Sequence, residues 1–193
     1  MDCSLASVCG GCSLRHLDEK EYRQRKCAVV QKALQSITRQ DFVFSEPVFI
    51  KEGCRRRASF AFRRAGGGIV LGFNAYRSNE IVDLPGCPQL TPALNPGLEF
   101  FRGLLSELCR VPLTVKEGRK GRAKTVYVEK GDLWLTEADN GLDAVLEFDR
   151  PLNLELREII FERVSAAADV VRVSHRFAPD RPAETILEKG RPY

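Results

Sequence analysis

Residues 57–84 read RASFAFRRAGGGIVLGFNAYRSNEIVDL. Two runs rich in apolar residues flank the glycine triplet at 66–68, and a third, at 80–84, leads into a Pro-Gly-Cys-Pro turn. Apolar runs of this length separated by turn residues are typical of strands joined by short loops. The stretch therefore predicts an antiparallel meander with strands at 57–64, 69–76 and 80–84.

Upstream of the meander, the sequence predicts one helix and one further strand. Four residues recur at spacings of three, four and three with basic residues between them: Cys27, Val30, Leu34 and Ile37. This is the period of an amphipathic helix, which we expect over residues 18–37. Residues 41–50 are rich in Phe and Val and are expected to form a strand.

Downstream of the meander, helices and strands alternate. Thr91 and Pro92 are suited to begin a helix whose apolar residues extend to Leu108, and Pro151 is suited to open another. Further strands are expected at 111–116, 124–129, 132–138, 142–148, 170–174 and 185–188. Lys130-Gly131 and Asn140-Gly141 are the expected turns. The predicted fold class is α+β: an antiparallel sheet with packed helices and a Cys-rich N-terminal loop.

Composition excludes several classes of protein. Of 193 residues, 44% are hydrophobic and 29% charged, which is ordinary for a folded domain and gives no support to a disordered or collagen-like chain. No apolar run reaches the roughly 18 residues of a membrane-spanning helix, and no basic-then-apolar leader begins the sequence, so we expect a cytoplasmic protein. The seven cysteines, an odd number, favour reduced thiols over a disulfide framework.

Three cysteines occupy one short loop, Cys3-x5-Cys9-x2-Cys12. Gly10 and Gly11 between the last two can turn backbone N–H groups toward bound sulfur. Tetrahedral zinc and a four-iron cluster both take four ligands, and Cys87 in its Pro-Gly-Cys-Pro turn is the best distant candidate for the fourth. Spacing alone does not choose between the two metals. The other three cysteines are expected to be small buried hydrophobes: Cys27, Cys54 and Cys109.

Between Gly53 and Asn79 every charged residue is an arginine. The six are Arg55, Arg56, Arg57, Arg63, Arg64 and Arg77. Aromatic residues are interleaved with them: Phe60, Phe62, Phe73 and Tyr76. Guanidinium groups bind phosphates and stack on bases, so the stretch favours folded, partly single-stranded RNA as the partner. For any single arginine the alternative is a solvated face with ion pairs, and strand alternation prevents all six from reaching one ligand. A second basic stretch holds Arg119, Lys120, Arg122 and Lys124.

Cys3-x5-Cys9-Gly-Gly-Cys12, followed by Ser-Leu-Arg-His and a basic amphipathic helix, resembles the cluster-binding segment of the RNA uracil-5-methyltransferase family. The resemblance continues at residues 53–58, 71–73, 81–83, 86–88 and 135–143, and so covers most of residues 3–175. The four-cysteine set is its most specific part and favours the branch that acts on 23S rRNA, because the transfer-RNA branch generally lacks it. The chain thus resembles the central domain of a longer enzyme.

The resemblance implies a four-iron, four-sulfur cluster held by Cys3, Cys9, Cys12 and Cys87. It further implies a division into a cluster-binding loop (1–16), an RNA-recognition domain (17–178) and the start of a linker (179–193) to a domain that binds S-adenosylmethionine. Arg55, Arg56 and Arg57 are the leading RNA contacts, with Arg63, Arg64 and Arg77 behind them.

The catalytic parts of the family are not recognisable in these residues. The family's nucleophilic cysteine is followed by Asn or Asp and then Pro, and none of the seven cysteines has that context. The glycine triplet joins two expected strands and does not open a helix, so it is no cofactor loop. We expect the 193 residues alone to be inactive, with no catalytic residue of their own.

Two other functions compete with this prediction. One is an RNA-binding module stapled by zinc with no enzyme attached, and zinc can also replace the cluster during aerobic purification. The other is a ferredoxin-like electron carrier, which is disfavoured because it leaves the arginines unexplained. No membrane and no obligate protein partner are implied.

Overall fold

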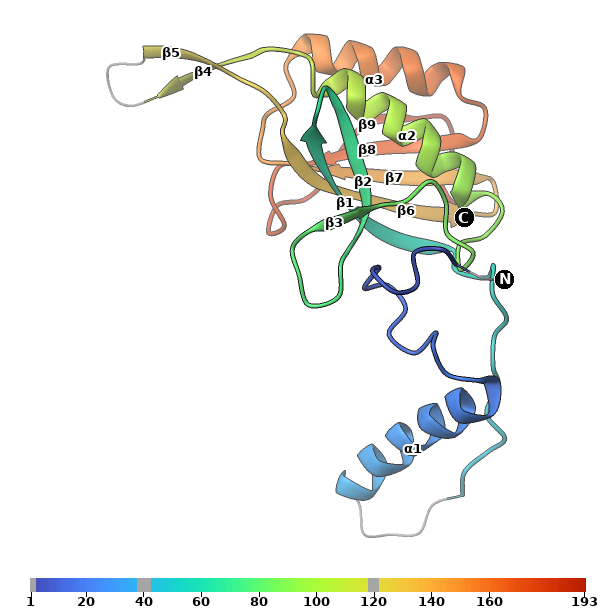
Figure 1. Ribbon diagram of the computed structural model, residues 1–193. Coiled ribbons are helices and arrows are strands. Elements are labelled where there is room, and N and C mark those ends of the chain that lie inside the picture. The colour runs from blue at the N-terminus through green and yellow to red at the C-terminus, as the bar shows by residue number, and fades with distance from the viewer. Residues whose placement is uncertain (1–2, 38–42, 118–121) are drawn as a thin grey trace.

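The described residues form a seven-stranded sheet with the strand order β3-β2-β1-β6-β7-β8-β9 (Figure 1). The computed structural model describes residues 3–37, 43–117 and 122–193. The strands of the sheet are β1 (Arg57–Ala65), β2 (Gly68–Asn74), β3 (Ile81–Asp83), β6 (Lys130–Ala138), β7 (Gly141–Glu147), β8 (Val170–Arg176) and β9 (Glu184–Glu188). A separate two-stranded ribbon consists of β4 (Leu113–Glu117) and β5 (Arg122–Val126).

The predicted meander is confirmed. β1 and β2 pair antiparallel around a turn at Gly66 and Gly67, whose φ angles of 53° and 85° suit glycine, and β2 pairs antiparallel with β3. Along β1, Ala58, Phe60 and Phe62 are buried, because alternate side chains of a strand point to the same face. This buried face is the one on which the helices pack.

Two helices cover one face of the sheet: α2 (Leu94–Leu108) and α3 (Leu154–Ala166) (Figure 1). From α2, Leu98 and Phe101 are no more than 1% exposed, and from α3, Ile160 is 0% exposed. Their close approach is visible at Gly97, where a Cβ would lie 2.4 Å from Leu142 Cδ1 of β7. The apolar core therefore lies between the sheet and these two helices, and none of the helices in the described residues packs on the other face.

The sheet is not wholly antiparallel, which corrects the predicted fold class in part. β7 and β8 pair in parallel, and α3 makes the crossover between them. Parallel neighbours need such a connection, so the helix predicted after Pro151 determines the direction of β8. Asn153 caps its N-terminus: the side chain accepts a hydrogen bond from the Leu156 N–H at 2.9 Å.

Several predicted boundaries were wrong. Residues 43–50 form no strand, and residues 41–42 lie outside the described part of the chain. α2 begins at Leu94 after Ala93, which makes no side-chain cap, so Thr91 does not cap the helix. Lys130 and Gly131 belong to β6 and make no turn between strands. The turn before Gly141 is confirmed, and so is an edge strand near 185–188, which pairs with β8.

The N-terminal helix α1 (Glu19–Ile37) lies away from the sheet (Figure 1). None of its residues is buried, and Val30, Leu34 and Ile37 are 50%, 37% and 81% exposed. The helix was predicted correctly, and its apolar stripe is exposed in the structure. Among the described residues, no helix has the length and apolar character needed to cross a membrane.

Candidate metal centre and nucleic-acid interface

The structure brings the four predicted metal ligands to one cavity. Cys3, Cys9, Cys12 and Cys87 all line it, and each is a free, half-buried thiol. The cavity measures about 20 Å³, and Phe73 and Leu84 give it an apolar wall. Residues from the N-terminal loop, from β2 and from the turn after β3 thus meet at one end of the sheet.

The loop that carries three of these cysteines is fixed to the sheet through its backbone. Cys9 forms an isolated β-bridge with Ala75, directly after β2. The Gly10 N–H donates to the Asn74 carbonyl at 2.9 Å, and a Cβ at Gly10 would lie 2.6 Å from the same oxygen. Only glycine allows this close approach. The Gly11 N–H points toward Cys9 Sγ at 3.4 Å, as expected from the glycine pair.

Cys87 is held in place by the first turn of α2. Its N–H donates to Asn95 Oδ1 at 2.9 Å, and the Asn95 Nδ2 group donates to the Cys87 carbonyl at 3.3 Å. This reciprocal pair fixes the Pro-Gly-Cys-Pro turn against the helix. The fourth thiol is therefore positioned independently of the loop that carries the other three.

Burial and charge act in opposite directions on the thiols of the cavity. Burial raises the pKa of the Cys12 thiol, the neighbouring Cys87 raises it further, and Arg15 and Arg55 oppose this shift. Arg15 is also paired with Glu52, at 2.6 Å. A metal must displace protons from such thiols, and the two arginines would offset the negative charge of four thiolates.

Four thiol donors suit either a tetrahedral zinc ion or a four-iron cluster. Four sulfurs must each lie about 2.3 Å from a single zinc ion, whereas a cluster spreads its thiolates over several irons. Among the described residues, no group of three or more His, Cys, Asp and Glu side chains is arranged to hold one metal ion. The cavity of about 20 Å³ has room for little more than one water molecule, so the thiols would have to turn outward around a cluster.

The three remaining cysteines do not share one environment. Cys109 is 1% exposed, and burial raises its pKa to about 11, which confirms it as a core residue. Cys54 is exposed and Cys27 is half-buried. The prediction of burial was therefore wrong for Cys54 and too strong for Cys27.

The six arginines of the RNA prediction are all exposed but do not form one patch. Arg57 and Arg63 alternate with the buried side chains of β1 and so lie on the face without helices. Arg64 stacks over Tyr127, with its guanidinium carbon 4.8 Å from the ring centre. Arg55 adjoins the cysteine cavity and Arg56 pairs with Asp139 at 2.5 Å.

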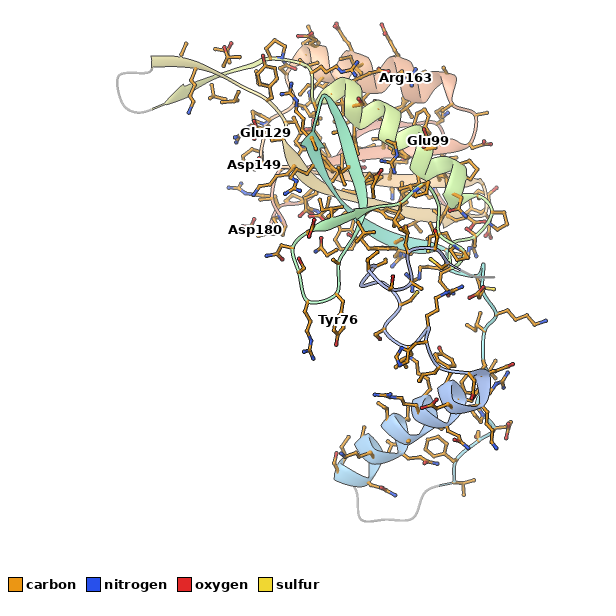
Figure 2. The ribbon with its side chains drawn as sticks, in the orientation of Figure 1. Tyr76, Glu99, Glu129, Asp149, Arg163 and Asp180 are labelled. Carbon is orange, nitrogen blue, oxygen red and sulfur yellow. The ribbon has the colours of Figure 1, made fainter. Side chains whose placement is uncertain are left out.

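The interleaved aromatic residues mostly serve the core. Phe60 and Phe62 are 0% and 1% exposed, and the Phe73 ring stacks on Phe60 at 5.1 Å between centres. Tyr76 is 60% exposed and lies with Arg77 in the loop between β2 and β3, where its side chain projects away from the sheet (Figure 2). The expectation that these four aromatics face RNA was therefore wrong for the two buried phenylalanines.

One exposed aromatic residue was missed by the sequence reasoning. Trp134 of β6 is 41% exposed, whereas Leu133 and Leu135 on either side are 0% exposed. Its signal was the alternation of the predicted strand, which places residue 134 on the face opposite the two leucines. Of the second basic stretch, Arg119 and Lys120 lie outside the described residues, and Lys124 is exposed.

Similar proteins place the chain among the RNA methyltransferases. It is 30% identical over 185 residues to an uncharacterized RNA methyltransferase of Agrobacterium fabrum, covering 96% of this chain and 39% of that protein. It is 32% identical over 185 residues to the 23S rRNA (uracil(1939)-C(5))-methyltransferase RlmD of Edwardsiella ictaluri, covering 93% and 38%. RlmD of Aromatoleum aromaticum is 34% identical over 144 residues, 71% of this chain and 33% of that protein.

The chain belongs to the RNA uracil-5-methyltransferase family. It spans between a third and two fifths of the length of these three relatives. No family model matches the chain.

Proposed function

We propose that this chain is the iron–sulfur and RNA-recognition portion of an S-adenosylmethionine-dependent enzyme that methylates C5 of uracil in RNA, with 23S rRNA as the substrate. The observation that carries the proposal is the meeting of four cysteines from two distant segments at one cavity. The RlmD relatives are named for methylation of 23S rRNA, which supports the choice of RNA.

In this proposal Cys3, Cys9, Cys12 and Cys87 hold a four-iron, four-sulfur cluster, and its iron–sulfur bonds tie the N-terminal loop to the end of the sheet. The chain's own contacts prepare this role. Gly10 docks the loop on Asn74, and Asn95 orients the turn of Cys87. Arg15 and Arg55 supply positive charge beside the sulfurs. The role is therefore structural.

The proposed RNA contacts begin with Arg55, Arg56 and Arg57, where the chain passes from the cysteine cavity into β1. Guanidinium groups here would position phosphates without reading sequence. Arg56 would exchange its exposed partner Asp139 for a phosphate at little cost, because exposed ion pairs contribute little. Arg63, Arg64 and Arg77 would extend the contact along β1 and into the loop after β2.

In this proposal, the residues that bind the methyl donor and the cysteine that attacks uracil lie outside this chain. A direct assay tests this: the 193-residue chain, labelled S-adenosylmethionine and unmodified 23S rRNA should yield no labelled RNA. Methyl transfer by the chain alone would contradict the proposal.

Anaerobic reconstitution with ferrous iron and sulfide tests the metal centre. We expect a brown protein with about four irons per chain, the content of one cluster. Cys87→Ser should abolish it, whereas the matched variant Cys54→Ser, at an exposed thiol outside the cavity, should load like the parent. Unchanged loading of Cys87→Ser would refute this ligand. Uptake of zinc but not of iron would favour the zinc-stapled RNA-binding module.

A salt titration of RNA binding tests the arginines. Replacing Arg55, Arg56 and Arg57 together by alanine should weaken binding of a 23S rRNA fragment. It should also make the slope of log affinity against log salt shallower by roughly 2, at about 0.7 to 0.9 per lost phosphate contact. The matched control replaces three arginines elsewhere: Arg157, Arg163 and Arg181. Equal slopes for the two triple variants would exclude the proposed contacts.

A further inference from the structure

The face of the sheet opposite α2 and α3 carries one large aromatic side chain at its centre. In the register of the sheet, Trp134 of β6 lies between Ser59 of β1 and Val145 of β7. Because these neighbours are small or of medium size, the indole is left 41% exposed. An exposed tryptophan in a central strand buries less apolar surface than the fold could bury, so stability of the sheet does not account for it.

Two broad hollows flank Trp134 along this face. One, of about 700 Å³, is lined by Arg57 and Thr136, two residues beyond Trp134 on β6. The other, of about 600 Å³, is lined by Arg63, Lys130 and Asp132 toward the opposite end. Trp134 lines neither hollow but lies on β6 between Thr136 of one and Asp132 of the other, and both hollows have cationic as well as acidic side chains in their walls.

The charges on this face leave its cations available at the two ends. Asp143 accepts two hydrogen bonds from Arg172, at 2.9 and 2.7 Å, and Glu147 accepts one from Arg176 at 3.1 Å. These acids are thus occupied by their own partners. Within the described residues, no ion pair engages three other cations of this face: Arg57, Arg63 and Lys130.

Asp132 lies with Arg63 and Lys130 in the wall of the second hollow, where its carboxylate offsets part of their positive charge. Burial raises the pKa of its carboxyl, and Glu147 raises it further. Arg57 and Arg63 are six residues apart on β1, so they lie about 20 Å apart at a rise of about 3.3 Å per residue. An aromatic ring with a cation on either side along one line matches a single strand of nucleic acid, with a base on the ring and phosphates at both ends.

We propose that Trp134 is a base-stacking residue for single-stranded RNA, with the strand running along the open sheet face from Arg57 to Arg63 and Lys130. This proposal rests on the proposed RNA-recognition function. It adds one aromatic residue to the proposed RNA contacts, which the pattern of arginines in the sequence does not indicate. A protein partner is less consistent with the face, because the centre of a protein interface is depleted of charge and this aromatic is bordered by cations.

Fluorescence gives a direct readout because Trp134 is the only tryptophan of the chain. We expect a single-stranded uridine oligonucleotide to quench its emission on binding, and a duplex of the same length to quench it much less. A concentration-dependent change of emission without RNA would indicate self-association through this face and would overturn the proposal.

Substitution provides the second test, with binding measured by gel shift so that it does not depend on tryptophan. Trp134→Ala should weaken single-strand binding by roughly 5- to 150-fold, the range for loss of one aromatic stack, and leave the salt slope unchanged. Trp134→Phe should retain most of the affinity. The matched control is Phe161→Ala, which removes a 55% exposed aromatic of α3 and should bind like the parent.

The outcomes separate this inference from the proposed function. If the parent binds RNA but Trp134→Ala binds equally well, the stacking role is overturned while RNA recognition stands. If the folded parent binds no RNA in the gel shift, the proposed function itself fails. Circular dichroism of Trp134→Ala must match that of the parent; where it does not, Trp134→Leu, which keeps apolar bulk but has no ring to stack on a base, replaces it as the variant expected to lose affinity.

Discussion

The N-terminal segment and the sheet are held in different ways. No residue within 3–37 or 43–50 is buried, whereas β1, β6 and β7 each contribute side chains that are 0% exposed. The sheet and its two helices are stabilised by burial of apolar surface, the largest favourable contribution to folding. The N-terminal segment contacts the sheet through backbone hydrogen bonds, the cysteine cavity and two partly buried residues, Leu5 and Cys9, and the Arg15–Glu52 pair ties it to the residues before β1. A bound cluster would hold this segment in place, as the burial of apolar side chains holds the sheet.

The largest effect is expected where burial is complete. Phe60→Ala removes a ring that is 0% exposed and should lower the free energy of unfolding by about 3–5 kcal/mol. Val48→Ala, at a residue 91% exposed in the N-terminal segment, should change it by less than about 0.5 kcal/mol. Urea denaturation measures both. Similar losses in the two variants would remove the distinction between the regions.

Thiol reactivity should also differ strongly between two cysteines. Burial raises the pKa of Cys109 to about 11, so at pH 8 only about one thiol in a thousand is ionised, against about a quarter for an ordinary thiol of pKa near 8.5. In the metal-free, reduced protein, Cys109 should react with iodoacetamide at least about 100-fold more slowly than the exposed Cys54, as followed by peptide mass spectrometry. Comparable rates would show that the core opens readily around Cys109.

A third variant separates the two regions without touching sulfur. In Gly10→Ala the new Cβ would meet the Asn74 carbonyl at 2.6 Å, so the cysteine loop must lift from β2. We expect iron uptake to fall severalfold, while the unfolding free energy of the sheet changes by less than about 1 kcal/mol.

The matched control is Gly103→Ala in α2, where the nearest atom to the added Cβ is the Arg163 guanidinium at 3.6 Å. This variant should retain iron uptake, and its free energy of unfolding should rise by about 0.5–1 kcal/mol, the usual advantage of Ala over Gly inside a helix. A large loss of sheet stability in Gly10→Ala would mean that the loop belongs to the core after all.

The smallest effect concerns acid. His175 is 5% exposed, and burial lowers its pKa, although a backbone contact with Phe148 opposes the shift. The unfolded chain therefore binds this proton more readily, and stability is lost as the pH falls through about 6.5 toward the lower folded value, by at most about 1.4 kcal/mol per pH unit. His175→Leu should lose less unfolding free energy than the parent between pH 7 and pH 5 in urea titrations, because the variant has no imidazole to protonate on unfolding. Equal losses of unfolding free energy in the parent and in His175→Leu would contradict a buried, neutral imidazole at position 175.

Local sequence patterns predicted where most strands lie, but not which strands pair with each other. The alternation of β1 and the glycine turn revealed the meander, because each depends on residues close in sequence. The parallel pairing of β7 with β8 depends on where α3 returns the chain, which no local pattern states. Residues 43–50 read as a strand because they are apolar, yet Val43 and Val48 are 97% and 91% exposed and have no neighbouring strand to pair with in the described residues.

The cysteine cavity was more accessible to sequence reasoning than the open face of the sheet. Spacing named Cys3, Cys9 and Cys12, a turn context added Cys87, and the structure brings all four to one cavity. Arginine composition, in contrast, does not say which face a side chain occupies. Trp134 was passed over because a tryptophan between two leucines reads as core until the alternation is applied.

The pairing of β1 with β6 sets an order of events during synthesis. Arg57 lies opposite Thr136, so this central pair closes a loop of 79 residues (136 minus 57), a slow step compared with the local hairpins β1–β2 and β6–β7. Every contact described for the cysteine loop is with residues no later than Asn95. All four proposed ligands therefore leave the ribosome before β6 does, and iron uptake by nascent chains that expose residues up to Asn95 but not β6 would show that the proposed centre assembles on β1, β2 and β3 before the central pair forms.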